Sequence, residues 1–341
     1  MKAAVYYDPD DIRCEELLRP RIGKGEILVR VRSCGLCGTD VSKMVEKTVA
    51  VPIVLGHEVA GDVVEVGEGV KNFRSGDRVC VAHHVPCFTC HYCRHGNHSL
   101  CEQFRSTNID PGGFAEYIRV PALNVKNTTF LLPENLSYEE ASLIESTACC
   151  LRAIKRYPLQ PGDTVVVVGA GPMGLLNLQL ALLLGADKVV ALDLMEQRLK
   201  VAEKLGATQS LNPGQEDPLE AVKQLTGGRG ADLAIVAVGK ITAIAQAIKL
   251  VRGGGTVLLF AESPPHSLLS LDPNVIYHSE VSLIGSYSST PQEQRMALEL
   301  MKTGKLKVKE LITHRFPLEK LSEAVVLARG ARESLKIMIT P

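Results

Sequence analysis

The pattern of hydrophobic and polar positions changes near the middle of the chain. Up to about residue 150, short segments alternate apolar and polar side chains between turn residues, as in residues 26–33, 61–69 and 77–84. Alternation with a period of two is typical of half-buried strands. The first part of the chain is therefore predicted to form a mostly β domain.

From about Pro161 the pattern becomes one of apolar, β-branched runs separated by helical stretches. The runs expected to form strands are residues 163–168, 188–193, 231–239, 253–261 and 281–289. This alternation is typical of βαβ units on a parallel sheet, so an α/β dinucleotide-binding domain of five or six strands is predicted. Residues 290–304 then read as a helix and residues 334–341 as an edge strand, and this tail is expected to rejoin the first domain.

Length, composition and charge balance exclude some classes of function. A chain of 341 residues suits two domains, and 45% hydrophobic with 22% charged residues is typical of a globular protein. Lys plus Arg and Asp plus Glu balance at 38 each, which argues against nonspecific binding of nucleic acid or anionic lipid. A small-molecule substrate is expected instead.

No targeting or membrane-spanning segment is expected. The most apolar stretch, residues 175–186, is too short to cross a bilayer and contains Asn177 and Gln179. The amino terminus carries acidic residues where an export signal needs an apolar core, so a cytoplasmic location is predicted. In that setting the ten cysteines are expected to bind metal or to be buried, as Cys14 and Cys80 are expected to be, rather than to form disulfides.

A glycine-rich loop joins the first predicted strand of the α/β domain to its helix. The sequence GAGPMG places Gly169, Gly171 and Gly174 in GxGxxG spacing, with Pro172 and Met173 in the same cofactor-binding loop. The glycines permit a tight turn, close approach to a pyrophosphate and close helix packing, while the helix amino terminus attracts phosphate. A dinucleotide is the predicted ligand.

The end of the next predicted strand bears on the choice of dinucleotide. Asp193 follows Gly174 by nineteen residues, where a carboxylate accepts hydrogen bonds from ribose hydroxyls and repels a 2′-phosphate. NAD is therefore favoured over NADP. Arg198, five residues further on, is placed near the adenine or a phosphate, which leaves NADP open.

Four cysteines lie on one short segment, CFTCHYCRHGNHSLC. Cys87, Cys90, Cys93 and Cys101 are separated by two, two and seven residues. Four thiolates suit tetrahedral zinc and leave no open coordination position, so a structural zinc site is predicted. An iron–sulfur cluster is the rival, but nothing else in the sequence indicates electron transfer. The three histidines of this segment are expected to be solvated.

A second group of metal-binding side chains stands upstream. Cys37 in CGLCGTD and His57 in GHE are candidate ligands of a catalytic zinc, although either alone would be read as a buried core residue. Such a zinc keeps three protein ligands and one open position, so a third donor must come from elsewhere. Glu145 is the candidate, with Cys149 and Cys150 as rivals. Glu58 is a possible transient ligand, and Asp40 is expected to orient the His57 ring.

Together these motifs resemble the zinc-containing medium-chain alcohol dehydrogenase family. The motifs CGLCGTD, GHEVAGDVVEVGEGV, GDRV, the four-cysteine segment, GGFAEY and GAGPMG occur in the family's order over nearly the whole chain. The resemblance implies a GroES-like β domain split in sequence, residues 1–153 and 290–341, that carries both zinc sites. It also implies an inserted Rossmann domain, residues 154–289.

The segment around Glu145 looks most like the polyol, sorbitol and threonine dehydrogenase branches, in which a carboxylate replaces a second cysteine ligand. The resemblance implies reversible oxidation of a secondary alcohol or polyol by NAD, with Thr39 accepting the alcohol proton. Two departures are visible. Ser42 stands where many relatives have a relay histidine, and Ser146 and Thr147 replace the common Pro and Leu, so the substrate is expected to be atypical.

Two alternatives remain open. A threonine or amino-alcohol dehydrogenase would need a cation that binds carboxylate, for which Lys43 and Arg152 are candidates. A catalytically inactive protein that binds zinc and NAD is a more remote possibility, because Cys37, Thr39, His57 and Glu145 are all present. A homo-tetramer is expected from the resemblance alone.

Overall fold

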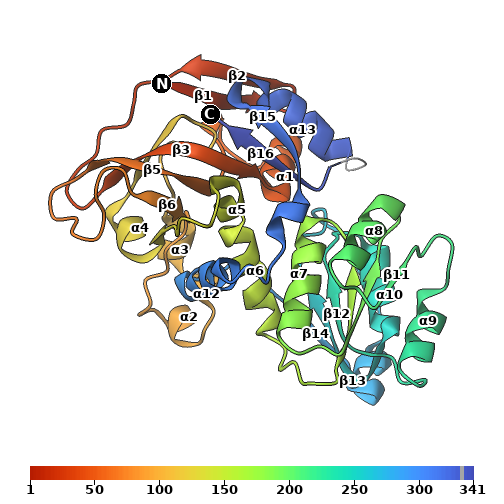
Figure 1. Cartoon of the computed structure of the whole chain (residues 1–341). Coiled ribbons are helices and arrows are strands. Elements are labelled where there is room, and N and C mark those ends of the chain that lie inside the picture. Colours follow the sequence, from red (N-terminus) through yellow and green to blue (C-terminus); the bar gives the residue numbers. More distant parts are fainter. Residues whose placement is uncertain (331–333) are drawn as a thin grey trace. The chain divides into compact units, whose positions relative to one another are not determined.

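The computed structural model describes residues 1–330 and 334–341 and contains two compact units. The first unit comprises residues 1–148, 289–304 and 308–341, and the second comprises residues 149–288 and 305–307. The boundaries expected from the sequence lay at 153/154 and 289/290. In Figure 1 the first unit is drawn in red to yellow and, for its carboxy-terminal part, in dark blue.

The first unit contains two sheets. One has the order β2 (Asp11–Glu16), β1 (Lys2–Asp8), β4 (Ile53–Val54). The larger sheet has the order β15 (Ile312–Pro317), β16 (Lys336–Thr340), β3 (Ile27–Leu36), β5 (Glu58–Val66), β6 (Arg78–Val81), β8 (Thr129–Leu131), and β7 (Tyr117–Val120) also pairs with β3. The tail therefore pairs with the amino-terminal strands (Figure 1).

The prediction that residues 334–341 form an edge strand is wrong. β16 lies between β15 and β3, parallel to the former and antiparallel to the latter. Its first four residues are buried in succession, which is the pattern of an interior strand covered on both faces. This interior position carries Lys336, the first residue of β16, into the centre of the unit.

Short helices complete the first unit. Those longer than one turn are α1 (Gly38–Glu46), α3 (Glu102–Ser106), α4 (Ala122–Asn127), α5 (Tyr138–Ser142), α12 (Pro291–Lys302) and α13 (Leu321–Gly330), and α6 (Ile144–Ile154) begins here. Ile27, Val29 and Val31 of β3 are buried in the main core, and Leu28 between them is buried as well, because β3 is an interior strand. Aliphatic side chains of α13 pack into the same core.

The second unit is a six-stranded parallel sheet with helices. Its strand order is β11 (Gln209–Leu211), β10 (Lys188–Leu192), β9 (Thr164–Val168), β12 (Ala231–Val236), β13 (Val251–Leu259), β14 (Ser282–Gly285). The helices are α7 (Pro172–Leu183), α8 (Glu196–Lys204), α9 (Pro218–Leu225), α10 (Ile241–Leu250) and α11 (Pro273–Ser279). Every residue of β9 is buried, as expected of a central parallel strand. The predicted fold class, a GroES-like β domain with an inserted Rossmann domain, is confirmed.

Cysteine burial follows the expectation only in part. Cys80 is buried, whereas Cys14 is exposed, so its predicted core position is wrong. Cys14 lies on the edge strand β2, which is not fully buried at any position and carries polar residues on both faces. Within the described residues, no helix has the length and apolar character needed to cross a membrane.

Candidate metal and dinucleotide sites

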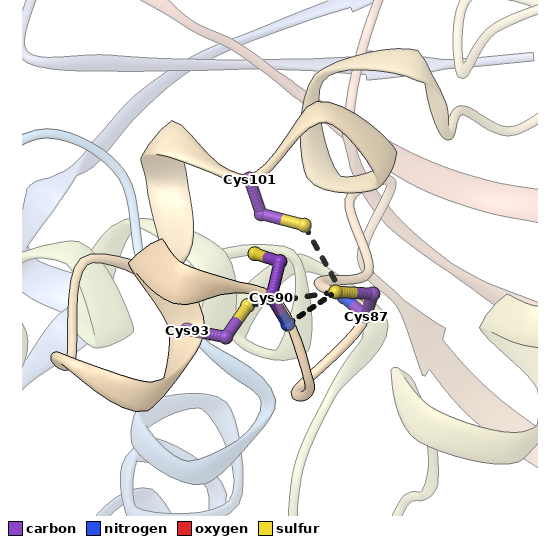
Figure 2. Close-up of side chains that lie close together, drawn as sticks. All are labelled: Cys87, Cys90, Cys93 and Cys101. Carbon is purple, nitrogen blue, oxygen red and sulfur yellow. Dashed lines mark hydrogen bonds between the residues drawn. The ribbon is translucent and has the colours of Figure 1, made fainter.

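The four-cysteine segment forms a loop between β6 and β7. Cys90 precedes the single-turn helix α2 (His91–Arg94), Cys93 lies within it, and Cys101 precedes α3. Figure 2 shows the four side chains turned toward one another, and their Sγ atoms all lie within 4.8 Å of one another. The backbone N–H of Cys90 donates to Cys87 Sγ at 3.3 Å, and that of Cys87 to Cys101 Sγ at 3.4 Å. Such N–H groups stabilise thiolates, which are the form that binds zinc.

The loop has almost no apolar interior besides these sulfur atoms. Its core consists of Cys93, Cys101 and Phe104, with Cys87 and Cys90 packed against them. Hydrogen bonds from Thr89 and from the N–H of Cys90 lower the pKa of Cys87 to about 6. Burial, followed by hydrogen bonds among the thiols, raises the pKa of Cys93 to about 12. A closed set of four thiols with mixed acidity fits structural zinc, which draws the remaining protons off.

The upstream cluster brings together residues from two turns. Cys37 is the N-cap residue of α1, and its thiol accepts the N–H of Thr39 at 3.5 Å. His57 lies directly before β5, and Glu58 is the first residue of that strand. Ligand atoms of Cys37, His57 and Glu58 all lie within 4.8 Å of one another. A soft thiolate beside an imidazole and a carboxylate fits zinc, with fewer protein donors than the closed loop has.

Asp40 lies behind this cluster, as the sequence predicts. Its Oδ1 is 3.2 Å from His57 Nδ1, and its Oδ2 accepts the backbone N–H of Cys37 at 3.2 Å. Burial alone would lower the pKa of His57, but Asp40 and Cys37 raise it well above its ordinary value. A carboxylate on Nδ1 leaves Nε2 to bind metal, an arrangement common among zinc-binding histidines.

Glu58 is held by a buried network of its own. Lys336 Nζ lies 2.6 Å from Glu58 Oε1 and 2.5 Å from Oε2, and only the first contact has hydrogen-bond geometry. The hydroxyl of Ser146, on α6, donates to the same Oε1 at 2.6 Å. Burial lowers the pKa of Lys336, but Glu58 and Cys37 raise it by more, so the net shift is upward and the ion pair persists.

The other predicted catalytic residues lie around this cluster. Glu145 stands in the first turn of α6, beside a small pocket that Val59 and Phe130 also line, and its charge contributes to the raised pKa of Lys336. It is not among the three grouped residues, so its role as third ligand stays a prediction. Thr39 is exposed in the first turn of α1, and Ser42 is half-buried one turn later.

The glycine loop has the geometry that the sequence predicts. Gly171 is the N-cap residue of α7, with Pro172 at the first helical position and Met173 after it. A Cβ at Gly174 would lie 1.8 Å from the backbone oxygen of Gly169, so helix and strand approach too closely for any side chain. Gly169 has φ of +97°, which glycine adopts without strain.

Asp193 follows β10 and faces the same loop. Its Oδ2 accepts the N–H of Ala170 at 2.8 Å, and its Oδ1 accepts the N–H of Met195 at 2.9 Å. Arg198 Nη1 lies 3.6 Å from Asp193 Oδ2. The same Nη1 lies 3.7 Å from the position that a Cβ on Gly171 would take. Both predicted cofactor residues are thus adjacent to the glycine loop.

Two protein-family models match the chain. The model of the alcohol dehydrogenase GroES-like domain matches residues 23–129, and the zinc-binding dehydrogenase model matches residues 172–303. The sorbitol dehydrogenase of Bacillus subtilis is 35% identical, covering 100% of this chain and 97% of its own. The chain belongs to the zinc-containing alcohol dehydrogenase family. It is a zinc-dependent oxidoreductase of alcohols and polyols that uses a nicotinamide dinucleotide.

Two further members of the zinc-containing alcohol dehydrogenase family are similar over nearly their whole length. The L-threonine 3-dehydrogenase of Bacillus licheniformis is 34% identical over 94% of this chain and 93% of its own. The crystal structure of the 2R,3R-butanediol dehydrogenase from Bacillus subtilis has a TM-score of 0.88 and 30% identity, covering 100% of this chain and 99% of its own. Family membership is therefore compatible with several alcohol substrates.

Sequence reasoning missed two residues beside the cluster of this dehydrogenase. The His83 ring lies 4.8 Å from that of His57, centroid to centroid, and its Nδ1 is buried without a hydrogen-bond partner. Burial lowers the pKa of His83 well below its ordinary value, so its ring is neutral at neutral pH. The histidine pair that ends the predicted strand of residues 77–84 was a visible signal. Lys336 gave no such signal, because it is 278 residues from Glu58.

Proposed function

We propose that this dehydrogenase oxidises a polyol or another secondary alcohol with NAD, using a catalytic zinc held by Cys37, His57 and Glu145. The grouping of Cys37 and His57, with Asp40 on the far nitrogen of the imidazole, carries the proposal. A zinc ion held by these residues would lower the pKa of the substrate hydroxyl. The four-cysteine loop would hold the second zinc, with a structural role.

Residues of α1 would transfer the proton of the substrate hydroxyl towards solvent. Thr39 is exposed next to Cys37, and its hydroxyl would accept the substrate proton. Ser42, one turn further along α1, would stand at the solvent end of the relay in place of a histidine. A serine hydroxyl passes a proton only by accepting one at the same time, so this end of the relay would depend on water.

Asp193 supports the choice of NAD. Two backbone N–H groups fix its carboxylate beside the glycine loop, where it would accept the ribose hydroxyls and repel a 2′-phosphate. Arg198 forms an ion pair with that carboxylate, so part of its charge is already compensated in the absence of the 2′-phosphate of NADP. Both observations favour NAD, and comparison of NADH with NADPH by nicotinamide fluorescence tests the preference.

His83 favours a polyol over a simple alcohol. Its unpartnered Nδ1 is a ready hydrogen-bonding group near His57, and a second substrate hydroxyl would satisfy it. His83→Phe should therefore lower kcat/KM for sorbitol or butane-2,3-diol while sparing propan-2-ol. Threonine is the second candidate substrate, favoured by the relative of that name. Preference for threonine over every polyol would reject the polyol assignment.

We also propose a homo-tetramer in the cytoplasm. Support comes from the second unit, in which β14 pairs with β13 alone and α11 buries none of its residues. Ile276 and Tyr277, neighbours on α11, are 36% and 78% exposed and would be covered by a second subunit. Sedimentation equilibrium measures the assembly directly.

Two variants test the catalytic assignment. Thr39→Val should keep both zinc ions and the NADH affinity while turnover falls by about 100-fold or more, the usual size of a general-base contribution. Cys37→Ser should lose one zinc and all turnover, whereas a catalytically inactive family member would show no turnover before mutation. Wild-type turnover by the Thr39 variant would exclude this residue from the relay.

A further inference from the structure

A column of four aromatic rings joins the two candidate metal sites of the first unit. Between ring centroids, His57 lies 4.8 Å from His83, and His83 lies 3.8 Å from His84. The His84 ring lies 4.7 Å from that of Phe104. These separations place each ring in contact with the next. One end of the column is a proposed ligand of the catalytic zinc, and the other end belongs to the four-cysteine loop.

Phe104 forms the loop end of the column. It lies in α3, its side chain is 1% exposed, and it makes up the core of the loop together with Cys93 and Cys101. Since cysteines supply the rest of that core, the position of the Phe104 ring depends on how the loop folds around them. Zinc bound by four thiolates would stabilise that fold. The state of the loop therefore determines where the column ends.

His84 is fixed to the segment that follows the loop. Its Nδ1 donates to the backbone oxygen of Thr107 at 2.7 Å, since a carbonyl oxygen can only accept. The Thr107 hydroxyl accepts the N–H of Val85 at 2.8 Å and donates to the backbone oxygen of Phe104 at 3.2 Å. The backbone beside His84 is thus tied to α3 as well, so a displacement of α3 would displace the His84 ring.

The His83 ring depends on its neighbours for its position. Its Nδ1 is buried and has no hydrogen-bond partner among the described residues. Asn124 Nδ2 donates to the backbone oxygen of His83 at 2.9 Å, which holds the main chain but leaves the ring free to rotate. Close packing against His57 and His84 therefore selects the orientation of this ring.

We propose that His84 is a positioning residue through which the four-cysteine loop orients the His83 ring and so sets the preference for a second substrate hydroxyl. The inference rests on the proposed polyol function and on the role of His83 in it. A loop folded around its zinc would hold Phe104 and His84 in place and keep His83 Nδ1 within reach of that hydroxyl. Without this zinc the column would lose its support, and polyols would lose their advantage over simple alcohols.

Paired variants at His84 separate the ring from its hydrogen bond. H84N keeps a donor for the Thr107 oxygen and removes the ring, whereas H84F keeps a ring and removes the donor. H84N should lower kcat/KM for butane-2,3-diol relative to propan-2-ol by about 10-fold, the loss of one hydrogen bond, and H84F should retain the wild-type ratio. Dissociation constants of both alcohols from the zinc-loaded complex with NADH, measured by nicotinamide fluorescence, should show the same change without turnover.

The matched control is H95N. His95 lies in the same loop and its Nδ1 likewise donates to a backbone oxygen, that of His91 at 2.8 Å, but it is exposed and outside the column. Its ratio should equal that of the wild type. A wild-type ratio in H84N, or an equal fall in H84F, would overturn the positioning role and leave the polyol function standing. A wild-type ratio in H83F would reject the polyol role of His83, and the positioning role with it.

A double-mutant cycle tests the link to the zinc of the loop. C93S, shown by metal analysis to lack one zinc, should lower the same ratio by about 10-fold, but C93S/H84N should lower it no further than H84N alone. F104L keeps all four cysteines and removes the last ring of the column, so it gives the same comparison if C93S does not fold. Additive losses in the cycle would show that the loop and His84 act independently, which would overturn the coupling.

Discussion

Among the salt bridges of the first unit, the buried ion pair between Lys336 and Glu58 should cost the most stability when one partner is removed. The side chains are 4% and 0% exposed, so neither charge can be hydrated when the other is removed. K336M keeps the length of the side chain and removes its charge, leaving a carboxylate in the core. Removing one partner of a buried pair costs about 3–5 kcal/mol. That is a large fraction of the stability of a typical domain.

The matched control is K2M. Lys2 lies on a strand as Lys336 does, and its Nζ is 2.7 Å from Glu319, but the two side chains are 49% and 48% exposed. Water replaces the lost contact there, so the same Lys-to-Met change should be nearly neutral. Urea unfolding of the zinc-loaded protein, followed by far-ultraviolet circular dichroism, compares the two variants.

The double variant E58Q/K336M completes the test. Glutamine removes the unpaired charge, so the free energy of unfolding should recover most of the loss seen in K336M. Metal content is measured on each sample, because zinc loss would lower stability independently. If K336M loses no more stability than K2M, the pair is hydrated in solution and the reasoning fails.

Three further predictions concern zinc and the dinucleotide. C93S should remove one zinc per chain. In the wild type, the zinc affinity of the four-cysteine loop should rise between about pH 6 and pH 8, because Cys93, with its raised pKa, releases a proton when zinc binds. Competition with a chelator measures both, and a pH-independent affinity would contradict the second. G174A should lower both the stability of the protein and its NADH affinity, because a Cβ at Gly174 would meet backbone atoms. G171A should weaken NADH binding alone, because a Cβ at Gly171 has room. Equal unfolding midpoints for the two variants would contradict this prediction. D193N should weaken NADH binding by about 10-fold, the loss of one charged hydrogen bond, and leave NADPH binding less affected; an unchanged ratio of the two affinities would count against the role of Asp193.

Local patterns predicted the second unit and the four-cysteine loop. The strand β9, the glycine turn and α7 form one continuous segment, so their geometry depends on neighbours in sequence. The cysteines of the loop are equally local. In each case the residues that meet in space are near in sequence, and spacing alone is informative.

The contacts around Glu58 could not be predicted in the same way. Its partners lie on β16 and α6, and their positions depend on the register of strands that meet only after folding. A one-residue shift would turn Lys336 to the opposite face of its sheet. Ser146 was visible as a departure from relatives, but its role depends on where α6 points.

Because β16 is an interior strand, the first unit cannot complete its larger sheet until the end of the chain has been synthesised. The strand pairs with β3, yet the whole second unit lies between them in sequence. A nascent chain therefore exposes the open edge of β3, and leaves Glu58 without its lysine, until the second unit has been made. The inserted unit has all its strands in one uninterrupted segment and is free to fold first. A ribosome stalled before β16 would hold a finished dinucleotide-binding unit and a metal centre that still lacks Lys336.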